Sequence, residues 1–369
     1  MLDTRGEARP CTLARDSLWE ENGDRDLRQA WSGAKISQLR AEFRSGKLPR
    51  QCAACAEKTA AGYESRRERM NANLKRWGRA SDSDWEAQKR RWLDDGTKEL
   101  KMLDIAFDRV CNLSCSMCSP EYSTSWARAL GESSPSPREM PRELFEEVLA
   151  SAAGLERIWV KGGEPFASPR ALEFLERLPK TGFCGEVYIA TNATLIGERA
   201  MAALRGLPSL GLSISVDGVG QVYDWIRGEK FARVEEGIAR ALSLSNIGSL
   251  RIAFTASAHN LWNLPDFMEW DLRQRTLDPR YGGAHFLQYA AEEKLRCENL
   301  PLADRREIRA LSEKYAGAYA EKDLQNLWNV LARPDASAES QVKFHQWTRQ
   351  MNQLRGRDLY QILPRLPRP

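Results

Sequence analysis

The sequence predicts a protein of the α/β class, in which six parallel strands curl into a full or partial barrel with helices outside. From about residue 100, the chain alternates short apolar runs with segments of helical pattern, as in a parallel sheet covered by helices. The apolar runs are nearly continuous, which is typical of strands buried on both faces. Right-handed crossovers between such strands bend the sheet toward closure.

The expected elements follow one another regularly along the chain. Strands are expected at 101–108, 155–162, 185–192, 209–218, 249–257 and 283–290. Helices are expected around 138–152, from Pro169, near 197–205, and over 230–245, 262–276 and 302–322. Functional groups of such barrels lie on the loops that follow the strands. The stretches CNLSCSMC, GGEP, TN and SVDG occupy those loops and are therefore candidates for a site.

The composition argues against a membrane-spanning protein and leaves the charge of a partner open. No run of about 18 apolar residues occurs in the 369-residue chain. The first residues, MLDTRGEARP, are polar and do not resemble a signal peptide, so a cytoplasmic location is expected. Clustered cysteines there bind metals more often than they form disulfides. The net charge of +4, from 55 basic and 51 acidic residues, neither demands nor excludes an anionic partner.

One local excess of positive charge stands out. Residues 63–92 carry nine Arg or Lys side chains against five acidic ones. Two interpretations stay open at this point: a solvated helix face, or a contact for a phosphate-bearing substrate.

Three cysteines follow the first expected strand with the spacing C-x3-C-x2-C. They are Cys111, Cys115 and Cys118, and no fourth thiol lies beside them. A three-thiolate loop suits a [4Fe–4S] cluster whose fourth iron takes an external ligand, such as the amino and carboxylate groups of a methionine moiety. The alternatives are a zinc loop, which needs four closed ligands, and incidental buried cysteines.

The cysteine loop after the first strand, together with GGEP after the second, resembles the radical S-adenosylmethionine (radical SAM) enzymes over about residues 100–290. The resemblance implies a partial (β/α)6, TIM-like barrel whose three cysteines are both metal ligands and catalytic residues. It implies a cluster that cleaves SAM reductively to a 5′-deoxyadenosyl radical, which abstracts a hydrogen atom from the substrate. It also implies an electron donor such as flavodoxin or ferredoxin.

The resemblance assigns cofactor contacts to further residues. Met117 would lie against the adenine, and the segment Gly162, Gly163, Glu164 and Pro165 would hold the SAM ammonium group. Asn192 would contact the ribose, Ser215 and Asp217 the ribose or the substrate, and Arg227 the SAM carboxylate. Ordinary core packing for Met117 and tight turns at Asn192 and Asp217 are the competing interpretations.

The N-terminal part carries Cys11 and the pair Cys52 and Cys55, in CAAC. Its segment LRQAWSGAKISQLRAEFRSGKLPRQCAAC resembles the auxiliary-cluster segment of the SPASM and twitch-type group of radical SAM proteins. The resemblance implies an auxiliary iron–sulfur cluster on these three cysteines, with an open iron or a distant fourth ligand. A zinc site or an empty site remains the alternative.

Three domains are expected from this organisation. Residues 1–98 form the mostly helical auxiliary-cluster module with a basic helical linker, 99–295 the barrel, and 296–369 a C-terminal helical extension. In the extension, Trp347, Leu354 and Leu359 are expected to pack on the barrel.

We therefore expect a radical SAM enzyme acting on a small molecule, such as a nucleoside-like or sugar-like metabolite. A peptide maturase is one alternative, although the N-terminal hundred residues lack the strand-rich pattern of a peptide-recognition domain. A non-enzymatic iron–sulfur or zinc protein is the other. A nucleic-acid substrate would rest on residues 63–92 alone and is not expected, because no RNA-binding motif is present. No membrane partner is expected.

Overall fold

The computed structural model describes residues 1–19, 25–60, 65–77, 99–288 and 292–368, with positions 84, 86, 87 and 90 between them. The end of the basic stretch 63–92 and the end of the expected strand 283–290 therefore lie partly outside the described residues. Within them, no helix is long and apolar enough to cross a membrane.

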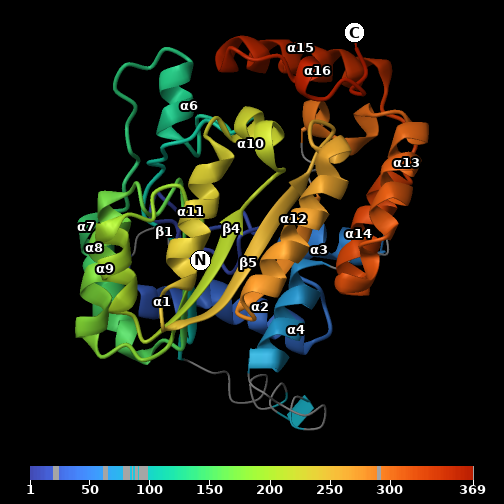
Figure 1. Ribbon diagram of the computed structural model, residues 1–369. Coiled ribbons are helices and arrows are strands. Elements are labelled where there is room, and N and C mark those ends of the chain that lie inside the picture. The colour runs from blue at the N-terminus through green and yellow to red at the C-terminus, as the bar shows by residue number, and fades with distance from the viewer. Residues whose placement is uncertain are drawn as a thin grey trace.

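Six parallel strands, hydrogen-bonded in chain order, form the centre of the molecule, as the sequence predicts (Figure 1). They are β1 (Met102–Ala106), β2 (Arg157–Lys161), β3 (Glu186–Thr191), β4 (Ser209–Ser215), β5 (Ile247–Ala256) and β6 (Tyr281–Gln288). The flanking helices are α6 (Thr124–Ala129), α7 (Arg142–Ser151), α8 (Pro169–Arg177), α9 (Glu198–Arg205), α10 (Gly220–Arg227), α11 (Phe231–Leu242) and α12 (Leu264–Leu277). Helix α10, which directly follows the SVDG turn, was not predicted.

Strands β1, β2 and β3 are buried mainly on one face, which corrects the expectation of strands buried on both, whereas β4 is buried on both faces from Leu210 to Ile214. Leu103, Ile158 and Val187 are at most 3% exposed beneath the helices, because every second side chain points outward. The alternate positions form the inner face, which is largely polar and partly exposed. They include Asp104, Arg157, Trp159, Lys161, Glu186, Tyr188, Ser213, Arg251 and His285.

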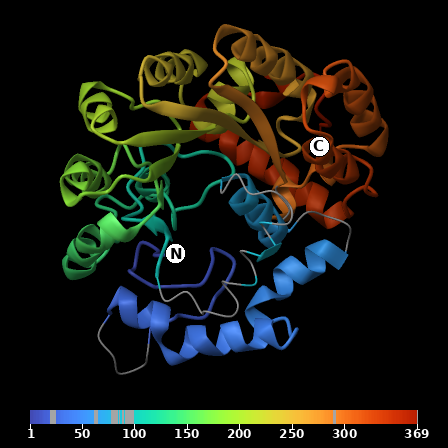
Figure 2. The same ribbon diagram turned by 90° about the horizontal axis from the view of Figure 1, so that it is seen from below.

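The curled sheet stays open between β1 and β6, and the N-terminal module lies across the opening (Figure 2). Its helices are α1 (Leu27–Ser32), α2 (Ala34–Arg44), α3 (Ala53–Ala60) and α4 (Arg66–Trp77). Leu2 pairs with the free edge of β1: its N–H donates to the Asp104 carbonyl at 2.7 Å, and its carbonyl accepts from Ala106 at 3.0 Å. This extension of the sheet was not predicted from the sequence.

Where one helix was expected over 302–322, the C-terminal extension has the helix α13 (Leu302–Glu313) and the start of a second helix, α14 (Glu321–Leu331). It also contains α15 (Ala338–Arg355) and α16 (Leu359–Ile362). The buried Arg305 side chain donates to the carbonyls of Leu300, Leu331 and Arg333, and this connects α13 to α14. Leu359 is fully buried as predicted, but Leu354 is 39% exposed, so its predicted packing is wrong. Helix α15 lies over the carboxyl ends of the strands (Figure 1).

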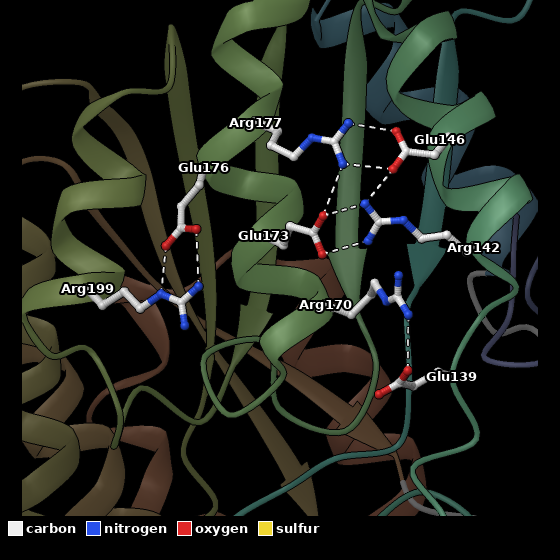
Figure 3. Close-up of polar contacts among 8 residues, drawn as sticks. All are labelled: Glu139, Arg142, Glu146, Arg170, Glu173, Glu176, Arg177 and Arg199. Carbon is white, nitrogen blue, oxygen red and sulfur yellow. Dashed lines mark hydrogen bonds and ion pairs between the residues drawn. The ribbon is translucent and has the colours of Figure 1, made fainter.

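Ion pairs join the outer surfaces of neighbouring barrel helices (Figure 3). Arg177 of α8 contacts Glu146 of α7 at 2.6 Å and Glu173 at 3.0 Å, and Arg142 contacts the same two carboxylates. Arg199 of α9 binds Glu176 of α8 at 2.7 Å. These side chains are largely exposed, so the apolar face beneath them contributes more to stability than the ion pairs do.

Candidate functional site

The cysteine loop leaves the carboxyl end of β1 and is fixed by the start of α6. The hydroxyl of Ser123 donates to the Leu113 carbonyl at 2.6 Å, and the indole N–H of Trp126 donates to the Cys115 carbonyl at 2.7 Å. The Ser125 hydroxyl donates to the Cys111 carbonyl at 2.7 Å. The backbone of the loop is therefore held by hydrogen bonds to its carbonyls.

The three thiols of this loop are electrostatic neighbours. Burial and the nearby Cys115 together raise the pKa of Cys118 to about 12. Burial and the same neighbour also raise the pKa of Cys111. The guanidinium of Arg227 donates to the Cys115 sulfur at 3.6 Å. Positive charge at this point would favour the thiolate forms that a metal cluster requires.

The free thiols are not positioned as the ligands of one metal ion. Across the described ranges, no three or more Cys, His, Asp or Glu side chains are arranged to hold a metal ion. The surroundings nevertheless fit a polar ligand, because three buried polar atoms beside the loop have no hydrogen-bond partner among the described residues. They are Ser116 Oγ, the Tyr223 hydroxyl and Arg227 Nε.

The GGEP loop packs directly against the cysteine loop. The N–H of Glu164 donates to the Val110 carbonyl at 2.7 Å, and that of Gly163 to the Asp108 carbonyl at 3.3 Å. A Cβ atom on Gly163 would overlap the Val110 carbonyl, and Gly162 has a φ of +147°. Both glycines are therefore required for the two loops to approach this closely.

The carboxylate of Glu164 is buried and already engaged. It accepts hydrogen bonds from the Thr191 hydroxyl and the Asn192 N–H, each at 2.6 Å, and from the Phe166 N–H at 3.1 Å. Burial raises its pKa, while these hydrogen bonds act in the opposite direction. The side chain fastens the end of β3 to the GGEP loop, a role that the sequence did not indicate.

Asn192 meets two residues that sequence reasoning missed. Its amide donates to Asn112 at 3.0 Å, and its carbonyl oxygen accepts from the Thr194 hydroxyl at 2.7 Å. The Asn112 amide donates to the same hydroxyl at 3.0 Å. The signal was available, since Asn112 lies inside the cysteine motif and Thr194 two residues after Asn192.

Asp217 and Arg227 form a buried ion pair at the same end of the sheet, with side chains 0% and 11% exposed. The other Asp217 oxygen accepts from the Thr255 N–H at 2.6 Å. Ser215, at the end of β4, and Met117 are half-buried. The Pro165 carbonyl accepts from the Ser168 N–H at 3.3 Å.

Helix α15 contacts the cysteine loop, and its Trp347 packs on the barrel as predicted, although the sequence did not indicate which residues it meets. The indole N–H of Trp347 donates to the Ser116 carbonyl at 3.0 Å, and its ring stacks on Trp126 with centroids 5.7 Å apart. Arg355 donates to the Ser114 hydroxyl at 3.1 Å and to the Trp225 carbonyl at 2.8 Å.

The N-terminal cysteines are also electrostatic neighbours. Burial raises the pKa of Cys52, and the neighbouring Cys11 and Cys55 raise it further. The remaining cysteines lie apart from both groups: Cys184 is exposed, and Cys297 is buried in the core.

Comparison with known proteins agrees with this arrangement. Residues 105–255 match the family described as the radical SAM superfamily. Over 171 residues the chain is 26% identical to the GTP 3′,8-cyclase of Parasynechococcus marenigrum (strain WH8102), covering 44% of this chain and 46% of the cyclase. Over 159 residues it is 30% identical to the GTP 3′,8-cyclase of Peptoclostridium acidaminophilum, covering 41% and 46%. The chain thus spans about half the length of these curated relatives.

Among solved structures, the chain is similar to Streptococcus suis SuiB bound to S-adenosylmethionine. The TM-score is 0.45 with 15% sequence identity, over 68% of this chain and 58% of SuiB. The matched segment 105–255 is a radical SAM domain, so the predicted superfamily and enzyme class are confirmed. The SPASM or twitch subgroup and the cytoplasmic location stay predictions.

Proposed function

We propose that Cys111, Cys115 and Cys118 hold a [4Fe–4S] cluster and that the chain cleaves SAM to act on a small molecule. When bound, the cluster and SAM supply the one-electron reduction that yields methionine and a 5′-deoxyadenosyl radical, which takes a hydrogen atom from the substrate. A flavodoxin or ferredoxin supplies the electron. The observation that carries this proposal is the hydrogen-bonded union of the cysteine and GGEP loops at the carboxyl ends of β1 and β2.

The surrounding residues would share out the contacts to SAM. Arg227 uses one nitrogen for Asp217 and one for Cys115, which leaves its buried Nε for the SAM carboxylate. The backbone of Gly162–Pro165 would hold the ammonium group. Three polar side chains at the ends of β3 and β4 would contact the ribose: Asn192, Ser215 and Asp217. Met117 would lie against the adenine.

Anaerobic reconstitution with a reductant tests the proposal. The wild type is expected to convert SAM to 5′-deoxyadenosine. The Cys111→Ala/Cys115→Ala/Cys118→Ala variant is expected to lose this activity, and Cys184→Ala, which changes an exposed cysteine, to keep it. A wild type with an intact cluster that produces no 5′-deoxyadenosine would point instead to a non-enzymatic iron–sulfur protein.

We further propose an auxiliary iron–sulfur cluster on Cys11, Cys52 and Cys55. The resemblance of the segment around Cys52 and Cys55 to an auxiliary-cluster segment supports it, and the three thiols affect one another electrostatically. Iron counts test it: about eight irons in the wild type, falling to about four in the triple alanine variant of the barrel cysteines, are expected for two [4Fe–4S] clusters. About four irons falling to none would leave only the barrel site.

The substrate is proposed to be a nucleoside-like or sugar-like small molecule rather than a peptide. The two curated relatives described above are named for a reaction of GTP, which supports a substrate of this class. A panel of nucleosides, nucleotides and peptides, each scored for consumption of the compound together with formation of 5′-deoxyadenosine, separates the two classes.

A further inference from the structure

The inner face of the sheet changes character directly below the GGEP loop. Lys161 ends β2, is the residue before Gly162, and pairs across the sheet with Ala106. Ser213 of β4 pairs with Ala190 on one side and with Arg251 on the other. The side chains of this layer are therefore small except for two cations. Closed barrels normally fill such layers with bulky branched residues.

Arg251 is exposed although it lies within β5, between buried neighbours. Its side chain extends over Gly282 of β6, where a Cβ atom would lie 3.3 Å from Arg251 Cγ. Solvent therefore reaches the inner face at this point, and the glycine leaves room for the guanidinium.

Among the residues that the structure describes, positive charge in this region exceeds negative charge. A single carboxylate oxygen of Asp104 serves two cations: Lys161 Nζ at 2.9 Å and Arg66 Nη2, from α4, at 3.2 Å. Arg251 has no carboxylate partner within the described part of the chain. Burial first, and then the positive charges of Arg69 and Arg251, lower the pKa of His285 to about 4.

The layer below is aromatic, and Lys161 Nζ lies over the Trp159 ring at 5.6 Å from its centroid. The rings of Trp159 and Tyr188 meet edge to face with centroids 5.5 Å apart. Among the described residues, Trp159 Nε1 and His285 Nδ1 are buried without a hydrogen-bond partner. Such atoms are usually satisfied by a ligand or by water. At the starts of β2 and β3, Arg157 and Glu186 form an ion pair, so these two charges neutralise each other.

We propose that Lys161 and Arg251 bind an anionic group of the substrate, a phosphate or a carboxylate, in the small-residue layer below the GGEP loop. An ammonium and a guanidinium are the side chains that recognise such anions. The anion would anchor the substrate beneath the cofactor loops. The catalytic meaning of this site rests on the proposed function, but the binding itself requires only these side chains.

Calorimetric titration of the reconstituted protein with pyrophosphate, and separately with succinate, tests the site at constant ionic strength. Arg251→Gln is expected to weaken the bound anion at least tenfold, and Arg251→Lys to retain most of the affinity. Arg205→Gln, which removes an exposed arginine from α9 on the outer surface, is the matched control and should leave binding unchanged. Binding of pyrophosphate alone identifies a phosphate site, and binding of succinate alone a carboxylate site.

Two results would overturn the proposal: a wild type that binds neither anion, or equal affinities for Arg251→Gln and Arg205→Gln. Its failure can be told apart from failure of the proposed function. Arginine-dependent pyrophosphate binding by a protein that never cleaves SAM would leave the anion site standing and remove the reaction. SAM cleavage by a protein that binds neither anion would support the proposed function and remove the anion site.

Discussion

At Gly163 the backbones of the cysteine loop and the GGEP loop come into contact. Any side chain there would overlap the Val110 carbonyl, so Gly163→Ala must push the GGEP loop away from the cysteine loop. We expect a loss of about 1–3 kcal/mol in the free energy of unfolding, together with reduced iron content after reconstitution. Urea unfolding and iron analysis measure the two effects. Gly197→Ala, where a Cβ atom would meet nothing within 4 Å, should change neither.

The Asp217–Arg227 pair predicts a second effect of a single residue. Arg227→Gln leaves a carboxylate that is 0% exposed without its cation, which costs about 3–5 kcal/mol in comparable buried pairs. The free energy of unfolding is therefore expected to fall steeply. Adding Asp217→Asn should recover much of the loss, because the orphaned charge is then gone. If the double variant were as unstable as Arg227→Gln, the ion pair would not be the cause.

The residues of the site divide by how far their partners lie along the chain. The cysteine loop and the GGEP loop could be recognised as candidate site segments from the sequence, because each is a short local pattern whose chemistry depends on its own residues. The hydrogen bond from Trp347 to the Ser116 carbonyl could not, since it joins residues 231 positions apart. The Glu164 carboxylate could be located but not assigned, because its partners on β3 depend on the register of the sheet.

At the scale of elements, α15 is attached to the barrel through a neutral histidine. His259 is fully buried, contacts the Thr348 hydroxyl at 2.9 Å and packs between Trp225 and Phe344. Burial lowers its pKa from 6.5 to about 3. Below about pH 6.5 the unfolded chain therefore binds a proton that the folded chain does not, and stability falls as the pH falls.

This linkage predicts a measurable slope. Between pH 6 and pH 4, the free energy of unfolding is expected to decrease by up to about 1.4 kcal/mol per pH unit from His259 alone. In His259→Gln the slope should be shallower by that amount, whereas His345→Gln, at a less buried histidine, should change it less. Identical slopes in the wild type and His259→Gln would exclude this histidine as the source.

The strand pattern shows what sequence could and could not supply at this scale. Runs such as RIWVK and EVYIAT predicted the strands, because their outward side chains are apolar and buried. The inward Arg157, Lys161 and Glu186 were present in the same runs. Their common face became clear only from the parallel register, which places residues of different strands side by side.

At the scale of the whole molecule, the N-terminal module and the barrel share one carboxylate on the inner face of the sheet. Asp104 of β1 binds Arg66 of the module and Lys161 of the barrel, and Leu2 pairs with the same strand. This shared contact makes the charge of the inner face depend on how the module is attached. Either part of the chain alone would present a different set of charges to a substrate.

Asp104→Asn separates attachment from charge. It removes the charge that holds Arg66, so α4 should exchange its amide hydrogens faster, which hydrogen exchange with mass spectrometry detects. It also leaves Lys161 and Arg66 uncompensated, so pyrophosphate should bind several-fold more tightly at low ionic strength, and the gain should vanish at 1 M salt. Glu198→Gln removes a carboxylate that is 87% exposed on α9 and should alter neither property. Weaker pyrophosphate binding by Asp104→Asn would mean that Asp104 orients the two cations toward the anion. The excess of positive charge would then not be the cause of anion binding.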